Sequence, residues 1–168
     1  MSVLLLLRHG IAEDFDAARM RGDQDRHLTE EGMSKIAAQL PAIVAMKLEI
    51  ALVLASPYPR AQETAEITAK ALDLKVETSD LLTPQSWPEA ILVELAKRKH
   101  DAVTLLVGHE PHLSSLASRV LSGGGDLAID LKKGGLIGLN LPKMQAPFHG
   151  ELMFSIPPKA LRMMSPKK

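Results

Sequence analysis

The sequence predicts an α/β fold, a three-layer sandwich in which a mainly parallel central sheet is flanked by helices. Continuous apolar runs at residues 2–7, 50–55 and 102–107 are typical of strands that are buried on both faces of a parallel sheet. Two later runs, at residues 136–141 and 151–156, are joined by a segment that contains proline, and they predict antiparallel strands at the C-terminal edge.

The segments between these runs predict helices. Thr29 is a suitable N-cap, and proline at position 59 suits the first turn of a helix. Helices are expected at residues 29–47, 59–73, 88–98 and 111–121, with a short strand at 75–78. Pro41 should kink or interrupt the first helix, because it lacks a backbone N–H. Residues 157–168 are expected to form a loosely packed terminus.

Composition limits the class of protein. The 168 residues fit one domain, residues 1–168, and 46% of them are hydrophobic, so a sizeable core is available. Twenty basic residues balance twenty acidic ones, which gives no electrostatic footprint for nucleic acid or a membrane. The chain has no cysteine, which excludes disulfides and thiolate chemistry. The first apolar run is too short to span a bilayer and lacks the flanks of a signal peptide, so we expect a cytoplasmic protein.

Basic and imidazole side chains follow the ends of the three long strands. Arg8 and His9 follow the first run, Ser56 and then Arg60 follow the second, and His109 follows the third. In open α/β sheets, ligands bind outside the carboxyl ends of the strands. The sequence therefore predicts an anion site at this edge.

These residue types suit phosphoryl chemistry. Guanidinium groups hold the oxygens of a phosphoryl group as planar forks and leave the phosphorus open to attack. A neutral imidazole is a competent nucleophile, and neighbouring arginines disfavour its protonation. Helix N-termini after the second and third strands add backbone donors. Gly10 lacks a side chain where the backbone would approach a ligand closely.

Taken in order, these motifs resemble the histidine phosphatase superfamily, also called phosphoglycerate-mutase-like. The motifs are Arg8-His9-Gly10, the segment SPYPRAQETA at 56–65, and Gly108-His109. The segments RHLTEEG at 26–32 and VGHEP at 107–111 are most similar to SixA-type phosphohistidine phosphatases. The resemblance implies that His9 is the nucleophile, that Arg8, Arg60 and His109 bind the phosphoryl group, and that Arg26 contacts it as well. Gly10 and Ser56 are further candidate substrate-binding residues.

The proton donor for the leaving group is left open by the sequence. The resemblance offers Asp80, in the segment where mutase-like members carry a glutamate, or Glu110, directly after the second histidine. Glu110 could equally cap the following helix. Imidazole, with a conjugate-acid pKa near 6.5, leaves far more readily than an alkoxide. A missing acid therefore favours phosphohistidine over sugar or serine phosphates.

The expected activity is thus that of a phosphatase with a covalent phosphohistidine intermediate and no metal or other cofactor. The expected partner is a phosphorylated protein, such as a histidine phosphotransfer domain, or a small phosphorylated substrate. A small-molecule phosphatase or mutase on the same fold remains an alternative. A non-catalytic phosphate-binding module is disfavoured, because it would not need the nucleophile.

Overall fold

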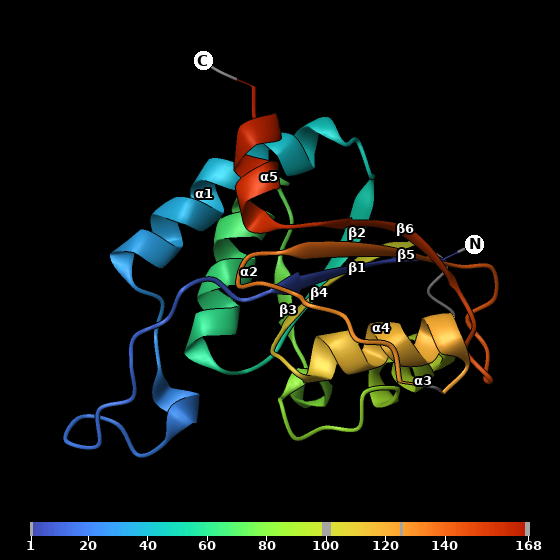
Figure 1. The fold of residues 1–168 in the computed structure, drawn as a ribbon, viewed down its shortest axis with the longest axis horizontal. Helices are drawn as coiled ribbons and strands as arrows, with labels where there is room; N and C mark the ends of the chain where they lie inside the picture. The colour runs from blue at the N-terminus through green and yellow to red at the C-terminus, as the bar shows by residue number, and fades with distance from the viewer. Residues whose placement is uncertain (1, 99–101, 125, 167–168) are drawn as a thin grey trace.

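The computed structural model describes residues 2–98, 102–124 and 126–166. Six strands form one sheet in the order β3-β2-β4-β1-β5-β6 (Figure 1). Along the chain, the elements are β1 (Ser2–Arg8), η1 (Asp23–Asp25), α1 (Glu30–Ala45), β2 (Ile50–Ala55), α2 (Pro59–Ala71), β3 (Val76–Thr78), η2 (Asp80–Leu82), α3 (Ala90–Lys97), β4 (Val103–Gly108), α4 (His112–Ser122), β5 (Leu136–Leu141), β6 (Glu151–Ile156) and α5 (Pro158–Met164), where η denotes a 3-10 helix.

Strand direction agrees with the predicted topology. β1 pairs in parallel with β4, and β2 pairs in parallel with both β4 and β3. β5 runs antiparallel to β1, and β6 runs antiparallel to β5. The prediction of a mainly parallel sheet with antiparallel C-terminal strands is therefore confirmed, and the carboxyl ends of β1, β2 and β4 lie along one edge.

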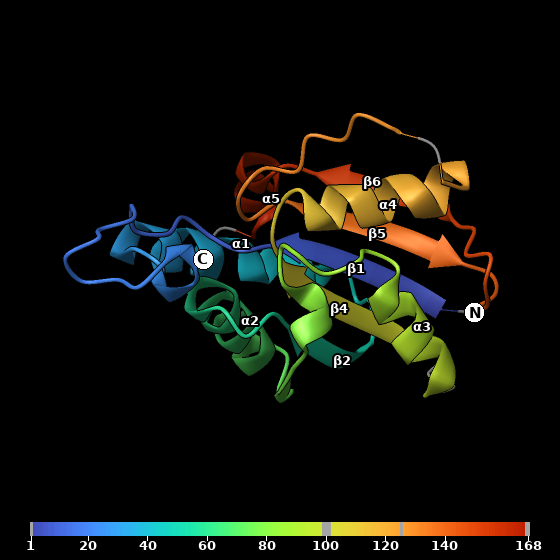
Figure 2. The same cartoon turned by 90° about the horizontal axis from the view of Figure 1, so that it is seen from below.

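Alternation along β1 divides the core into two layers. Leu4 and Leu6 pack on the side of α3 and α4, whereas Leu5 and Leu7 pack on the side of α1, α2 and α5. Figures 1 and 2 show these two groups of helices on opposite faces of the sheet. Because successive side chains of a strand point to opposite faces, an uninterrupted apolar strand requires helices on both sides.

Pro41 does not interrupt α1, so the expected interruption was wrong, while the alternative of a kink at Pro41 stays a prediction. The helix runs continuously from Glu30 to Ala45 with Pro41 inside it. Thr29 caps its start, accepting a hydrogen bond from the Gly32 amide at 2.9 Å. Burial of Ala42 and Ile43 against the sheet holds the turn that contains the proline, and tertiary packing of this kind overrides local propensity.

The C-terminal segment is also more ordered than expected. Its residues 158–164 form α5, which packs against α1 through the fully buried Leu161. The Ser165 hydroxyl donates to the Ala38 carbonyl of α1 at 2.9 Å. Leu161 is the one buried side chain of this short helix, and one buried position sets no periodicity that the sequence could reveal. Residues 167 and 168 lie outside the described residues.

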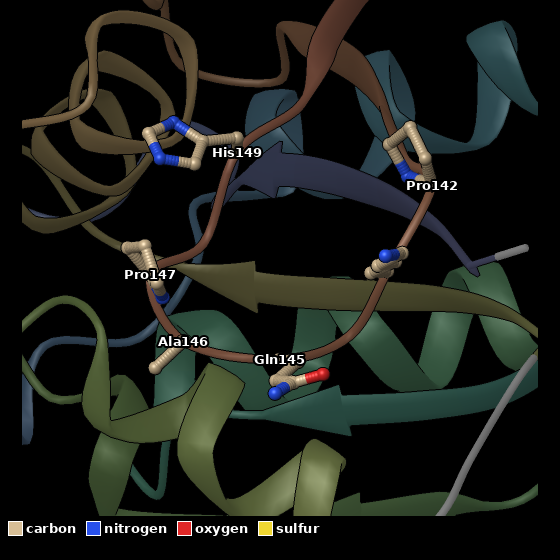
Figure 3. A pocket seen from close by; sticks show the side chains of 6 residues that line it. Pro142, Gln145, Ala146, Pro147 and His149 are labelled. Atoms are coloured by element: carbon tan, nitrogen blue, oxygen red, sulfur yellow. The ribbon is translucent and has the colours of Figure 1, made fainter.

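Two further observations concern parts of the molecule other than the carboxyl ends of the strands. None of the described helices is long and apolar enough to cross a membrane. A pocket of about 360 Å³ lies on the connection between β5 and β6, where Pro142, Pro147 and His149 are among its lining residues (Figure 3). None of the sequence-predicted site residues lines this pocket.

Candidate active site

His9 lies directly after β1 and is 5% exposed. Its Nδ1 lies 2.7 Å from the Gly10 carbonyl oxygen, which can only accept, so Nδ1 carries the proton. Nε2 is therefore the unprotonated nitrogen, and the Nε of Arg60 donates to it at 3.3 Å. Burial, together with the charges of Arg60, Arg8 and Lys133, lowers the pKa of His9 to about 3, although the Gly10 hydrogen bond opposes the shift. The imidazole is consequently neutral at neutral pH.

Arg60 lies in the first turn of α2, one residue after the proline that begins the helix, and is 3% exposed. A cation is unfavourable at a helix N-terminus, and a buried guanidinium requires an anionic partner. Asp23 supplies that partner: its carbonyl accepts from Arg60 Nη1 at 2.6 Å and its Oδ2 from Nη2 at 2.7 Å.

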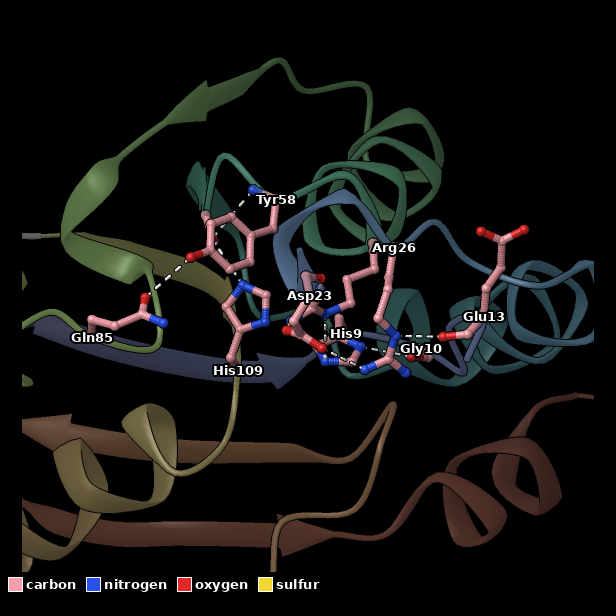
Figure 4. A network of polar contacts seen from close by, with 10 residues as sticks. His9, Gly10, Glu13, Asp23, Arg26, Tyr58, Gln85 and His109 are labelled. Atoms are coloured by element: carbon pink, nitrogen blue, oxygen red, sulfur yellow. Dashed lines mark hydrogen bonds and ion pairs between the residues drawn. The ribbon is translucent and has the colours of Figure 1, made fainter. Parts of the chain in front are cut away.

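His109 approaches His9 from the end of β4. The two ring centroids are 5.1 Å apart. His109 Nε2 is 2.8 Å from the Ser56 hydroxyl, whereas its buried Nδ1 has no hydrogen-bond partner in the described parts of the chain. Figure 4 shows this second ring nitrogen facing His9 and Asp23. Burial, then the proximity of His9 and Arg60, lowers the pKa of His109 to about 3.

Tyr58 completes this side of the site. Its ring centroid is 5.0 Å from that of His109, and the Arg60 guanidinium lies 5.3 Å from the Tyr58 centroid. The tyrosine hydroxyl donates to Gln85 at 3.1 Å (Figure 4). Sequence reasoning did not select Tyr58, although its position between the two prolines that open α2 places it next to Arg60.

Arg26 and Asp23 come from the polar loop between β1 and α1. The Nε of Arg26 donates to the Glu13 carbonyl, and its Nη1 donates to Asp23 Oδ1 at 2.8 Å. Asp23 therefore joins Arg26 to Arg60, with one carboxylate oxygen on each guanidinium. Asp23 was missed by sequence reasoning, and the available signal was its position three residues before the predicted phosphate-binding arginine.

Arg8 faces a different segment. Its Nη1 donates to the Leu131 carbonyl at 2.9 Å, in the stretch that leads into β5. Its buried Nε has no partner in the described chain. Burial lowers the pKa of Arg8, and the carboxylates of Glu110 and Asp130 oppose that shift. Arg8 thus contributes positive charge near His9 while its fork is partly engaged by backbone.

The two candidate proton donors lack contact with His9. Glu110 Oε1 accepts from the Ser114 amide at 3.0 Å, as a cap of α4 does. Asp80 is exposed, and its carboxylate makes no hydrogen bond within the described chain. The structure therefore gives Glu110 a structural partner, and neither carboxylate forms a hydrogen bond with His9 in the described parts of the chain.

Gly10 has a packing requirement of its own. A Cβ at this position would lie 2.9 Å from Ile36 Cγ1 and 3.2 Å from Leu28 Cδ2. The Gly10 amide donates to the Thr64 hydroxyl at 3.0 Å, which ties the end of β1 to α2. No group of three or more metal-ligating side chains occurs within residues 2–98, 102–124 and 126–166.

The sequence itself matches a known family. Residues 4–89 match the model of the histidine phosphatase superfamily, branch 1. An uncharacterized protein of Picosynechococcus sp. (strain ATCC 27264 / PCC 7002 / PR-6) is 34% identical over 163 residues, covering 94% of this chain and 98% of that protein. The phosphohistidine phosphatase SixA homolog of Haemophilus influenzae is 28% identical over 130 residues, covering 70% of this chain and 76% of that protein.

Solved structures share the whole fold. The protein histidine phosphatase SixA complexed with tungstate superposes with a TM-score of 0.81 at 23% identity, over 95% of this chain and 99% of that one. The mycobacterial glucosyl-3-phosphoglycerate phosphatase Rv2419c gives a TM-score of 0.71 at 18% identity, over 92% and 99% of the two chains. The chain belongs to branch 1 of the histidine phosphatase superfamily, and its fold is that of the SixA-type proteins.

Proposed function

We propose that this protein is a phosphatase that forms a covalent phosphohistidine on His9 and that it dephosphorylates phosphohistidine on a protein. The observation that carries the proposal is the 3.3 Å contact between Arg60 Nε and the unprotonated Nε2 of a buried, neutral His9. It pairs a nucleophile with a phosphate-binding cation on adjacent elements of the fold.

The reaction has two steps. In the first, the Nε2 lone pair of His9 attacks phosphorus in line, the bond to the leaving group breaks, and the leaving group departs with that electron pair. In the second, water attacks the phosphorus of the phosphohistidine, the N–P bond breaks as Nε2 regains its lone pair, and both protons of the water leave on the product as dihydrogen phosphate. Arg60, Arg26 and Arg8 hold the phosphoryl oxygens, and His109 donates from Nδ1, so positioning and charge stabilisation supply the catalysis.

The surroundings of the nucleophile favour a good leaving group. Glu110 caps α4 through the Ser114 amide, and the Asp80 side chain is exposed, with no hydrogen bond from its carboxylate in the described chain. A phosphohistidine ring that carries a proton on its other nitrogen leaves as neutral imidazole, which needs much less help from an acid than an alkoxide does. A protein phosphohistidine, for example on a phosphotransfer domain, is therefore the substrate that this site suits best.

A small phosphorylated molecule is the second candidate. It is supported by the shared fold with a glucosyl-3-phosphoglycerate phosphatase. One fold can serve several substrates, because specificity depends on the residues around the phosphoryl-binding groups.

The central experiment is a trap for the phosphoenzyme. Rapid quench with a phosphohistidine protein should leave acid-labile phosphate on the wild-type protein and on the exposed control His149→Ala, but not on His9→Ala. A panel of phosphohistidine protein, phosphoserine and sugar phosphates, with chelator present, then compares the two substrate classes. Full turnover by a folded His9→Ala protein would refute the nucleophile, and faster turnover of sugar phosphates would refute the protein substrate.

A further inference from the structure

We propose that Asp23 is a built-in counter-anion, which occupies the phosphoryl-binding arginines and is displaced when a phosphoryl group binds. This inference rests on the proposed function in one respect, namely that Arg60 and Arg26 hold the phosphoryl oxygens. It gives Asp23 a defined task in that site: to weaken the binding of phosphate and so to favour release of the product.

The contacts of Asp23 match those expected of a bound anion. Its Oδ2 lies 2.7 Å from Arg60 Nη2, and its Oδ1 lies 2.8 Å from Arg26 Nη1. Arg60 also donates to Nε2 of His9, so the Asp23 carboxylate and the proposed nucleophile share one guanidinium. A tetrahedral anion attacked by His9 would need the same donors.

Charge makes the two anions competitors. Although partial burial favours the neutral acid, hydrogen bonds from Arg26 and the charge of Arg60 hold the pKa of Asp23 below its usual range, so it is ionised. Like charges repel, and a phosphoryl group that carries up to two negative charges offers a buried arginine a stronger partner than one carboxylate. Binding of phosphate therefore requires Asp23 to leave Arg60.

The loop that carries both residues lets the Asp23 side chain move while Arg26 keeps its place. The base of the loop is fixed by an Ala12–Leu28 bridge and by Glu63, whose carboxylate accepts from the Leu28 amide at 2.7 Å. The Asp23 side chain, by contrast, is 57% exposed. It can rotate toward solvent while the backbone of the loop keeps its place.

Asp25 provides a matched control. It lies in the same 3-10 turn, two residues further along the chain. Its carboxylate accepts from the Arg21 amide at 2.8 Å and has no contact with Arg26 or Arg60 among the described residues. Replacing it removes the same charge from the same turn without freeing either phosphoryl-binding group.

The test is the binding of inorganic phosphate, measured by isothermal titration calorimetry at low ionic strength. Asp23→Asn should bind phosphate about tenfold more tightly than wild type, the size expected when a competing partly exposed ion pair and a like charge are removed. Asp25→Asn should stay within about twofold of wild type, as weakly coupled surface charges do. Asp23→Ala is the second variant, and its affinity should change in the same direction.

Steady-state inhibition adds a second measurement. The inhibition constant for phosphate should fall in Asp23→Asn by the same factor as the dissociation constant. Unchanged or weaker phosphate binding in both Asp23 variants, with thermal unfolding that shows them folded, would overturn the inference and indicate that Asp23 orients the arginines instead. If no phosphoenzyme forms on His9 yet Asp23→Asn binds phosphate more tightly, the proposed function fails while this inference stands.

Discussion

Arg60 Nε lies 3.3 Å from Nε2 of His9, and Nη2 of the same guanidinium donates to the Asp23 carboxylate at 2.7 Å. One side chain thus contacts both the candidate nucleophile and an anion. The fork geometry of arginine makes this possible, since its five N–H groups point in fixed directions in one plane.

Arg60→Lys should show that the fork, and not merely the charge, is required. Lysine keeps the positive charge but cannot contact His9 and a phosphoryl oxygen in two directions at once. We expect kcat/KM for a phosphohistidine protein to fall about 100-fold, the scale of losing one preorganised donor. Arg98→Lys, at the exposed end of α3, should behave as wild type. A loss of less than about threefold in kcat/KM for Arg60→Lys would show that the positive charge suffices without the fork geometry.

His9 should remain neutral through mildly acidic pH. Its unfolded-state pKa is near 6.5, and the folded-state pKa is about 3. The ring-nitrogen resonances of His9, assigned by their absence in His9→Ala, should not shift between pH 7.5 and 5.0. Titration of His9 with a midpoint near 6.5 would contradict the neutral nucleophile.

The same lowered pKa predicts how stability depends on pH. Above pH 6.5 both states hold a neutral imidazole, so there is no effect. Between pH 6.5 and about 3 the unfolded chain is the one that binds the proton, so the free energy of unfolding should decrease as pH falls. The slope is about 1.4 kcal/mol per pH unit for His9, and His109 adds a similar amount. Urea unfolding at pH 7, 6 and 5 measures the slope, which His9→Asn should reduce.

Ser56→Ala should disturb the orientation of His109. Ser56 Oγ accepts from the Tyr58 amide at 3.4 Å and lies 2.8 Å from His109 Nε2, and we expect its hydroxyl to donate to Nε2 and so to place the imidazole proton on Nδ1. Losing one such hydrogen bond should lower kcat about threefold to tenfold. Nitrogen chemical shifts of His109 should then show a mixture of tautomers. Ser114→Ala, a partly buried serine on α4 whose hydroxyl donates to the Pro111 carbonyl, is the control, and unchanged tautomer and kcat in Ser56→Ala would refute the positioning role.

Glu63→Gln should loosen the loop that carries Arg26. The Glu63 carboxylate accepts from the Leu28 amide at 2.7 Å and lies 2.6 Å from His27 Nδ1. An amide cannot accept on both sides, so we expect KM to rise about threefold to tenfold, with a smaller change in kcat. Hydrogen exchange in residues 12–28 should increase in parallel. Glu66→Gln, on the exposed face of α2, should change neither quantity. A Glu63→Gln protein with normal KM and normal hydrogen exchange would show that Glu63 does not hold the loop in place.

Sequence reasoning located the features that depend on local pattern. The apolar runs predicted the long strands to within about one residue, since a strand buried on both faces requires an unbroken run. The sequence predicted that His9, Arg60 and His109 lie close together, because each follows a strand of one parallel sheet. The roles assigned to these residues stay predictions until the variants are measured.

Features that depend on tertiary contacts could not be predicted from the sequence. Asp23 lies in a loop without periodicity, and only the folded chain brings it to Arg60 of α2, thirty-seven residues away. The contact of Arg8 with the Leu131 carbonyl spans 123 residues and involves a backbone atom, which carries no sequence signature. The α5 helix depends on one leucine side chain that becomes apolar core only when α1 is beside it.

The antiparallel direction of β5 brings a late segment of the chain to the end of β1. Because β5 runs opposite to β1, its first residues lie beside the end of β1, where the Gly134 amide donates to the Arg8 carbonyl at 3.0 Å. The loop at 126–133 therefore borders His9, although it follows every strand and helix that supplies the candidate nucleophile and the candidate phosphoryl-binding groups. We expect changes of length or charge in that loop to alter the choice of substrate more than the chemistry at His9, so the loop is a suitable place to re-engineer specificity.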